Sequence, residues 1–314
     1  MKIGFIGLGN VGGKLSGSLL RNGMALSVHD LNAAFVADFV SKGASDGVSP
    51  AHLMQTCDVV ITCLPSPAAS DAVVTEMLPY VGPGKIWMEM STTDANEVKR
   101  LGDLVLAAGG EAVDCPVSGG CHRADTGNIA IYAGCERATF DKVLPILKHM
   151  GRRILHVGAI GNSSTLKVMT NYLATANLIT VCEALTVMKA VGIDLGMTYG
   201  AIAMSSGTSF VHETESQLIL SGSRDANFTM DLVQKDIGLF QKITDDHGVP
   251  FDIYPVIIDI MTDGQKRFGD RAQSGRIIER LEKATGLSIL AGGFPEDLVD
   301  YEPEEIGYEV TERR

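Results

Sequence analysis

The sequence predicts an α/β domain built on a mostly parallel, doubly wound sheet, followed by an all-α helical domain. In the first half, short apolar runs such as KIGFIG and DVVITCLP alternate with stretches of helical length. This alternation is typical of parallel strands joined by helices on both faces of a sheet. After about Gly161, long helical periodicity replaces the strand-like runs. With 314 residues, the chain is long enough for two domains of roughly 150 residues each.

The expected elements follow from these patterns in chain order. Seven apolar runs predict strands: KIGFIG, ALSVHD, DVVITCLP, IWMEMS, EAVDCPV, IAIYAG and ILHVG. Helices are expected at 12–22, 33–42, 95–108, 163–191, 197–221, 229–246, 251–268 and 274–285. We therefore expect a first domain over 1–161, a helical domain over 162–290 and an acidic C-terminal extension over 291–314 at the surface.

Charge and composition exclude several classes of partner. The formal net charge of −12 argues against a nucleic-acid or anionic-membrane partner, because either would require a basic face. No signal peptide is visible at MKIGFIGLGN, and no uninterrupted apolar run reaches the ~18 residues that a membrane span needs. The six cysteines have neither C-x-x-C nor zinc spacing. We expect buried reduced thiols, no metal site and a cytoplasmic location.

A glycine-rich loop follows the first predicted strand. Gly7, Gly9 and Gly12 form G-x-G-x-x-G, with Asn10 and Val11 inside the motif, and an amphipathic helix follows directly. This is the context of a dinucleotide-binding fingerprint, in which the glycines allow a tight turn, a close phosphate and helix–strand packing. The helix N-terminus would also attract the phosphates. The motif predicts a Rossmann domain, although sites for FAD and S-adenosylmethionine share parts of it.

The second predicted strand, ALSVHD, ends in Asp30. An acidic residue at this place holds the ribose hydroxyls of NAD and repels the 2′-phosphate of NADP. Leu31 and Asn32, which follow, supply no arginine for that phosphate. The sequence therefore favours NAD over NADP as the cofactor.

Two further segments carry candidate chemistry. Ser118, Gly119 and Gly120 follow a strand, where backbone amides can converge on a carboxylate, or where the chain can simply turn. Lys167 is the only Lys, Arg, Asp or Glu between Arg153 and Glu183, in a helix that reads as apolar almost all round and hence buried. Such a lysine either extends to the surface or to an ion-pair partner, or serves as a proton donor and acceptor.

Taken together, four segments resemble the β-hydroxyacid dehydrogenase family, which includes 3-hydroxyisobutyrate dehydrogenase and tartronate semialdehyde reductase. They are GFIGLGNVG, DCPVSGG, GNSSTLKVMTN and FTMDLVQKD, in that order. The resemblance implies a Rossmann domain and a helical domain with the active site in the cleft between them. It also implies a small anionic hydroxy-acid or semialdehyde substrate and a homodimer or homotetramer.

The resemblance assigns roles to individual residues. Lys167 matches the catalytic lysine, and Asn171 matches the asparagine one turn later that helps to hold the substrate. Ser118, Gly119 and Gly120 match the substrate-carboxylate loop.

Other matched positions surround the cofactor. Thr92 and Lys235 match positions near the nicotinamide, and Leu64-Pro65 matches a loop over the cofactor. An exposed ion pair is the alternative interpretation of Lys235 and Asp236.

Departures from the family pattern leave the substrate open. They are Thr170, Cys115, Cys135 and the pair His122-Arg123. Arg123 either binds a second polar group of the substrate, or faces solvent or pairs with Asp125 or Glu136. An imine reductase of the same fold and a non-catalytic NAD-binding module are the alternative functions, but relatives of those kinds usually lack the lysine found here as Lys167.

Overall fold

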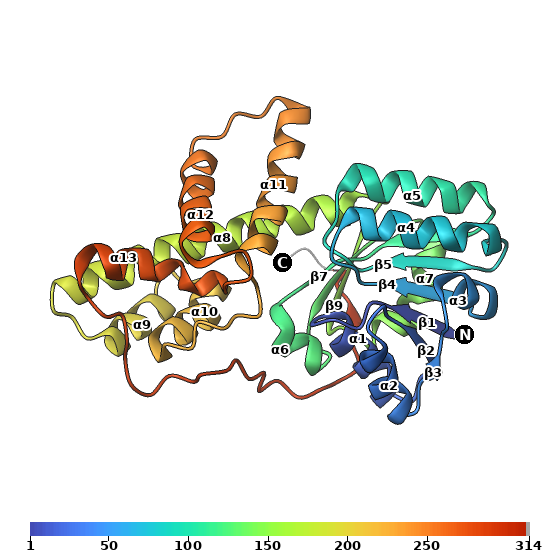
Figure 1. Ribbon diagram of the computed structural model, residues 1–314, viewed down its shortest axis with the longest axis horizontal. Helices are drawn as coiled ribbons and strands as arrows, with labels where there is room; N and C mark the ends of the chain where they lie inside the picture. The colour runs from blue at the N-terminus through green and yellow to red at the C-terminus, as the bar shows by residue number, and fades with distance from the viewer. Residues whose placement is uncertain (312–314) are drawn as a thin grey trace. The chain divides into compact units, whose positions relative to one another are not determined.

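The computed structural model describes residues 1–311, and the chain divides into two compact units (Figure 1). Unit 1 comprises Met1–Lys167 together with the chain from Asp300, and unit 2 comprises Val168–Val299. Unit 1 is a Rossmann-type α/β unit and unit 2 is helical, which confirms the predicted fold class.

Unit 1 contains one sheet, with strand order β10-β9-β8-β6-β5-β4-β1-β2-β3 and with β7 beside β8. Neighbouring strands are parallel except where β8 meets β6 and β7. The strands are β1 (Ile3–Ile6), β2 (Leu26–His29), β3 (Ser45–Asp46), β4 (Val59–Thr62), β5 (Ile86–Glu89), β6 (Glu111–Asp114), β7 (Val117–Ser118), β8 (Ala130–Gly134), β9 (Arg153–Gly158) and β10 (Tyr308–Glu309). All seven expected strands are present, although β6 ends at Asp114, before the end of the expected run.

Helices cover both faces of this sheet because the central strands are apolar on both sides. Phe5 and Ile61 belong to a core packed under α1, α2, α6 and α7, whereas Ile6, Val60 and Trp87 belong to a core packed under α3, α4 and α5. The helices are α1 (Gly12–Arg21), α2 (Ala33–Ser41), α3 (Pro50–Thr56), α4 (Pro67–Met77), η1 (Leu78–Tyr80), α5 (Ala95–Ala107), α6 (Gly120–Asp125) and α7 (Arg137–Leu147).

Unit 2 consists of helices around a second core. They are α8 (Asn162–Ala190), which begins in unit 1, α9 (Leu195–Ala203), α10 (Phe210–Ser221), α11 (Met230–His247), α12 (Tyr254–Phe268), η2 (Ser274–Ile277) and α13 (Ile278–Thr285). The single helix expected at 197–221 is wrong. The chain breaks there because Ser209 caps a new helix by accepting a hydrogen bond from the His212 amide.

Helix α8 is less buried than its composition predicts. Leu178, Cys182 and Leu185 lie in the core of unit 2, but half of the Leu173 side chain (50%) and of Val187 (53%) is exposed. Within residues 1–311, α8 is the one helix long and apolar enough to cross a membrane by length and composition. Buried core helices of soluble proteins pass the same test, but only 39% of this stretch is buried, so packing into the core of unit 2 accounts for only part of its apolar character.

Candidate active site

The glycine-rich loop joins β1 to α1 and has the shape that a dinucleotide requires. Gly7 has φ +96°, and a Cβ there would lie 2.2 Å from the Cys63 carbonyl oxygen. A Cβ at Gly12 would lie 2.0 Å from the Gly7 carbonyl oxygen, so the turn and the helix start both exclude a side chain. At exposed Gly9 a Cβ would meet no protein atom within 4 Å. Packing within the chain therefore does not explain Gly9, whereas a phosphate close to the backbone does.

Asp30 lies directly after β2 and is bonded to this loop. Its Oδ2 accepts a hydrogen bond from the Leu8 amide at 2.7 Å, and its Oδ1 accepts one from the Asn32 amide at 2.7 Å. Each carboxylate oxygen has a second acceptor position, so these bonds leave capacity for ribose hydroxyls. Asp30 therefore also has a structural role that the sequence did not indicate, because its bond to the Leu8 amide holds the glycine-rich loop in place.

The loops after β4 and β5 are joined through buried Glu89. The Leu64 amide donates to Ser91 Oγ at 2.7 Å, and the Ser91 amide and hydroxyl both donate to Glu89 Oε1. Burial raises the pKa of Glu89, although the hydrogen bonds from Ser91 act in the opposite direction. Pro65 and Thr92, two of the predicted cofactor residues, stand next to Leu64 and Ser91 in the chain, so Glu89 supports both loops.

The predicted carboxylate loop lies between β7 and α6. Gly119 has φ +132° and Gly120 has φ +85°, conformations that favour glycine at both positions. Ser118 ends β7, and α6 begins at Gly120, so the loop turns the chain from a strand directly into a helix.

Asp114 connects the sheet to the beginning of α8. Its Oδ2 accepts hydrogen bonds from the amides of Gly161 (3.0 Å) and Ser164 (2.9 Å), and its Oδ1 accepts one from the Ser164 hydroxyl (2.7 Å). The residue is completely buried, and burial raises the pKa of Asp114 to about 6 against the effect of these bonds. Lys167 follows Ser164 by three residues, about one helical turn, so Asp114 helps to set the position of Lys167.

Lys167 is buried, with 9% of its surface exposed. It therefore does not extend freely into solvent. Asn171 lies four residues later on the same helix face, and its Nδ2 donates to Oδ2 of Asp236 on α11. Lys235 Nζ lies 2.9 Å from the other oxygen of Asp236, which is 2% exposed. Lys235 and Asp236 are thus not an exposed ion pair, and Asp236 joins two predicted site residues in unit 2.

Arg123, on α6, forms an ion pair with Glu302 (3.3 Å), a partner that the sequence did not indicate. His122 is half-buried, and burial, followed by the charge of Arg123, lowers the pKa of its imidazole. The partner of Arg123 lies 179 residues away in the chain, which is why local sequence could not identify it.

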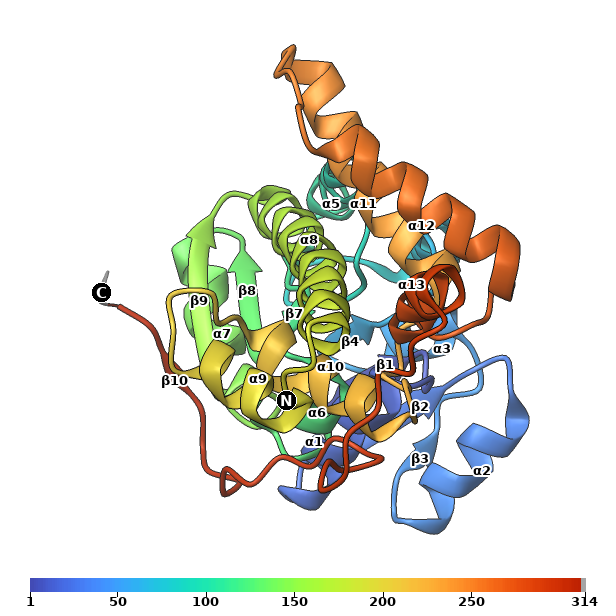
Figure 2. The same ribbon diagram turned by 90° about the vertical axis from the view of Figure 1, so that its left-hand side faces the viewer.

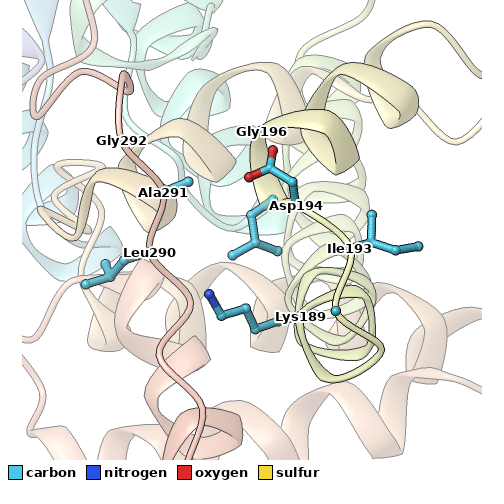
Figure 3. Close-up of a pocket in the computed structure, with 9 residues that line it drawn as sticks. Lys189, Ile193, Asp194, Gly196, Leu290, Ala291 and Gly292 are labelled. Atoms are coloured by element: carbon cyan, nitrogen blue, oxygen red, sulfur yellow. The ribbon is translucent and has the colours of Figure 1, made fainter.

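A pocket of about 410 Å³ in unit 2 contains none of the predicted site residues. Lys189 and Asp194 line it from one side, and Leu290, Ala291 and Gly292 line it from the other (Figure 3). The carboxylate of Asp194 already accepts the Met197 amide as the cap of α9. We assign this pocket no function.

Comparison with known proteins identifies the family. Residues 2–158 match the family model described as the NAD binding domain of 6-phosphogluconate dehydrogenase. Residues 161–281 match the model described as NAD-binding of NADP-dependent 3-hydroxyisobutyrate dehydrogenase. The chain belongs to the β-hydroxyacid dehydrogenase family. It is therefore an NAD(P)-dependent oxidoreductase that acts on the CH–OH group of its donor.

Individual relatives agree with this membership. The chain is 30% identical over 296 residues to 2-(hydroxymethyl)glutarate dehydrogenase of Eubacterium barkeri, an alignment that covers 93% of this chain and 98% of the relative. It is 29% identical over 241 residues to the human cytokine-like nuclear factor N-PAC, covering 76% of this chain and only 44% of that protein. A solved 3-hydroxyisobutyrate dehydrogenase of Mycobacterium tuberculosis has the same fold, with a TM-score of 0.80 and 23% identity over 89% of this chain and 98% of that one.

Proposed function

We propose that the chain is an NAD-dependent dehydrogenase that interconverts a small β-hydroxy acid and its semialdehyde or oxo acid, with Lys167 as general acid and base. The observation that carries this proposal is the burial of Lys167 on α8, one turn after the hydrogen bonds that Asp114 accepts from Ser164. Asn171 on the next turn, and the glycines 119 and 120, supply polar groups for a carboxylate-bearing substrate.

The reaction requires a hydride acceptor and a proton acceptor. When bound, NAD supplies the hydride acceptor for the hydrogen on the hydroxyl-bearing carbon. Lys167, as the neutral amine, takes the hydroxyl proton as the carbonyl forms, and returns it when the reaction runs in reverse. A buried lysine suits both steps because burial disfavours its charged form and so makes proton transfer easier.

The choice of NAD rests on Asp30. The loop fits a dinucleotide, since open space at Gly9 and the closed turn at Gly7 leave the backbone accessible to a pyrophosphate. Asp30 has acceptor capacity for ribose hydroxyls and would repel a 2′-phosphate. Leu31, which follows it, is 99% exposed and offers that phosphate no donor.

The substrate class rests on the carboxylate loop and on one relative. The name 2-(hydroxymethyl)glutarate dehydrogenase describes an enzyme whose substrate carries its hydroxyl on the carbon next to the carboxylate-bearing one. We therefore propose a screen of NAD reduction over 3-hydroxyisobutyrate, 2-(hydroxymethyl)glutarate, glycerate, serine, threonate, 4-hydroxybutyrate and sulfonate analogues, repeated with NADP.

The Lys167→Ala variant tests the mechanism on whichever substrate is found. We expect kcat to fall by roughly 10²–10⁴-fold, the usual contribution of a general acid–base group, while NAD binds as in the wild type. Lys189→Ala is the matched control, because it removes a lysine from the same helix outside the proposed site. A Lys167→Ala enzyme that keeps most of its activity would exclude this role. Failure of the wild type on every hydroxy acid and semialdehyde would favour the imine reductase or the non-catalytic module.

A further inference from the structure

The acidic C-terminal segment forms part of unit 1. Its strand β10 pairs with β9 in parallel, at the edge of the sheet (Figure 2). The match with the E. barkeri relative covers 98% of that protein but 93% of this chain, and the second family model ends at residue 281. The second family model therefore ends before this segment begins. We use the term strap for residues 300–311.

The first part of the strap binds the C-terminal end of α6 and the residues after it. Asp300 accepts hydrogen bonds from the Thr126 hydroxyl and from Asn128 Nδ2. The Glu302 carbonyl oxygen also accepts from Asn128 Nδ2 (2.9 Å), and the Glu302 carboxylate pairs with Arg123. Asn128 itself is 2% exposed, so the loss of a hydrogen-bond partner of its side chain would be costly, whereas the ion pair of Arg123 with Glu302 is exposed.

The next part of the strap binds α1 and the end of the sheet. Glu304 accepts hydrogen bonds from the Ser18 hydroxyl (3.2 Å) and from Asn22 Nδ2 (3.2 Å). At Gly307 a Cβ would lie 1.9 Å from the Gly151 carbonyl oxygen, so the backbones are in close contact. Two ion pairs, Glu305 with Arg152 and Glu309 with Arg137, complete the attachment. The strap therefore occupies a specific position instead of lying loosely on the surface.

Helix α6 depends on such contacts for its own position. It has only six residues, and an isolated helix of that length is not stable in water. At its N-terminal end stand Gly119 and Gly120, whose conformational freedom gives the loop no rigidity of its own. Buried Ala124 packs α6 into the core of unit 1, and from α1 Lys14 pairs with Asp125 at 3.5 Å and Arg21 donates to the Asp125 carbonyl oxygen. The strap adds the contacts named above at the C-terminal end of the helix.

We propose that the strap positions the substrate-carboxylate loop by holding α6 in place, with Asp300 and Glu302 as positioning residues. The inference rests on the proposed function of Ser118, Gly119 and Gly120. In this arrangement Glu302 also holds the Arg123 guanidinium, so Arg123 acts in the support of the loop.

Substitution of Asp300 separates positioning from general stability. Asp300→Ala removes the acceptor of Thr126 and Asn128, and we expect KM for the hydroxy acid to rise roughly five- to tenfold, with NAD affinity unchanged and kcat nearly so. Asp300→Asn keeps an acceptor oxygen and should restore most of the wild-type KM. Glu296→Ala removes an exposed carboxylate before the strap and is the matched control. Glu302→Gln should give a smaller rise, because it weakens one exposed ion pair.

Hydrogen exchange provides a readout that does not need turnover. We expect the amides of residues 120–128 to exchange roughly tenfold faster in Asp300→Ala than in the wild type, because α6 opens more easily. If the wild type turns over no hydroxy acid but exchange increases, the proposed function fails and only the structural part of the inference survives. An active enzyme with unchanged KM in Asp300→Ala would overturn the inference, whether or not its unfolding midpoint falls.

Discussion

The buried carboxyl group of Asp114 makes the stability of unit 1 depend on pH in an unusual direction. Most native carboxylates have a lowered pKa and stabilise the fold as pH rises. Burial raises the pKa of Asp114 to about 6, compared with ~3.9 in an unfolded chain. Between these values the folded chain binds more protons than the unfolded chain, so the contribution of Asp114 to stability is complete below pH ~4 and is lost as pH rises through about 6.

The size of this effect follows from the difference in pKa. About two pKa units correspond to about 3 kcal/mol of unfolding free energy. The substitution Asp114→Asn removes the titration while it can retain the hydrogen bonds. The Asn oxygen can accept from the amides of Gly161 and Ser164, as Oδ2 does now, and its NH₂ group can donate to the Ser164 hydroxyl, which reverses the present bond.

We therefore expect Asp114→Asn to become more stable relative to the wild type by about 3 kcal/mol between pH 4 and pH 7.5. Urea unfolding at both pH values measures this difference. Trp87, the only tryptophan, is buried on β5, so its fluorescence reports on unit 1 alone. An Asp103→Asn control removes an exposed carboxylate of the same unit. Wild-type and variant stabilities that change in parallel with pH would show that burial does not raise this pKa.

Three further predictions concern the cofactor and assembly. Asp30→Ala should weaken NAD binding and reduce the preference of the enzyme for NAD over NADP, measured as the KM for each cofactor. A wild-type enzyme that already prefers NADP would contradict our interpretation of the second strand. Gly12→Ala should lower the unfolding midpoint of unit 1, because its Cβ has no space, whereas Gly9→Ala should leave the midpoint unchanged and weaken NAD. Equal midpoints for the two variants would refute that distinction. The exposed apolar side chains of α8, such as Leu173, lead us to expect a dimer or tetramer, and a monomer in light scattering at micromolar concentration would exclude it.

The sequence predicted those elements whose burial leaves a recognisable pattern of apolar side chains. Strands such as β1 and β4 are continuous apolar runs because both of their faces are buried, and these runs were recognisable in the sequence. Strands β3 and β10 have two residues each, and pairing with a neighbouring strand, not composition, defines them. Composition also indicated that α8 is apolar, but it could not show which of its faces other helices cover.

The glycine-rich loop was predictable for a similar reason. Gly7, Gly9 and Gly12 are close in sequence, and the turn and helix start that they form are local structures. The spacing of the three glycines was therefore enough to predict this loop. The partner of Arg123 was not predictable in this way, because Glu302 is brought to it only by the return of the chain to unit 1.

Three buried acidic residues connect the predicted site residues, a role that the sequence did not indicate for any of them. Glu89 supports the loops that carry Leu64 and Thr92, Asp114 holds the start of the helix that carries Lys167, and Asp236 binds Asn171 and Lys235. Burial of a carboxyl group is unfavourable unless hydrogen bonds compensate for lost water. Burial raises the pKa of Glu89 and of Asp114 by more than their hydrogen bonds lower it. A gain in folding stability therefore does not explain why these two carboxyl groups are buried. Their positions beside residues assigned to cofactor and substrate are better explained by the need to hold those residues in a defined geometry, at some expense of stability.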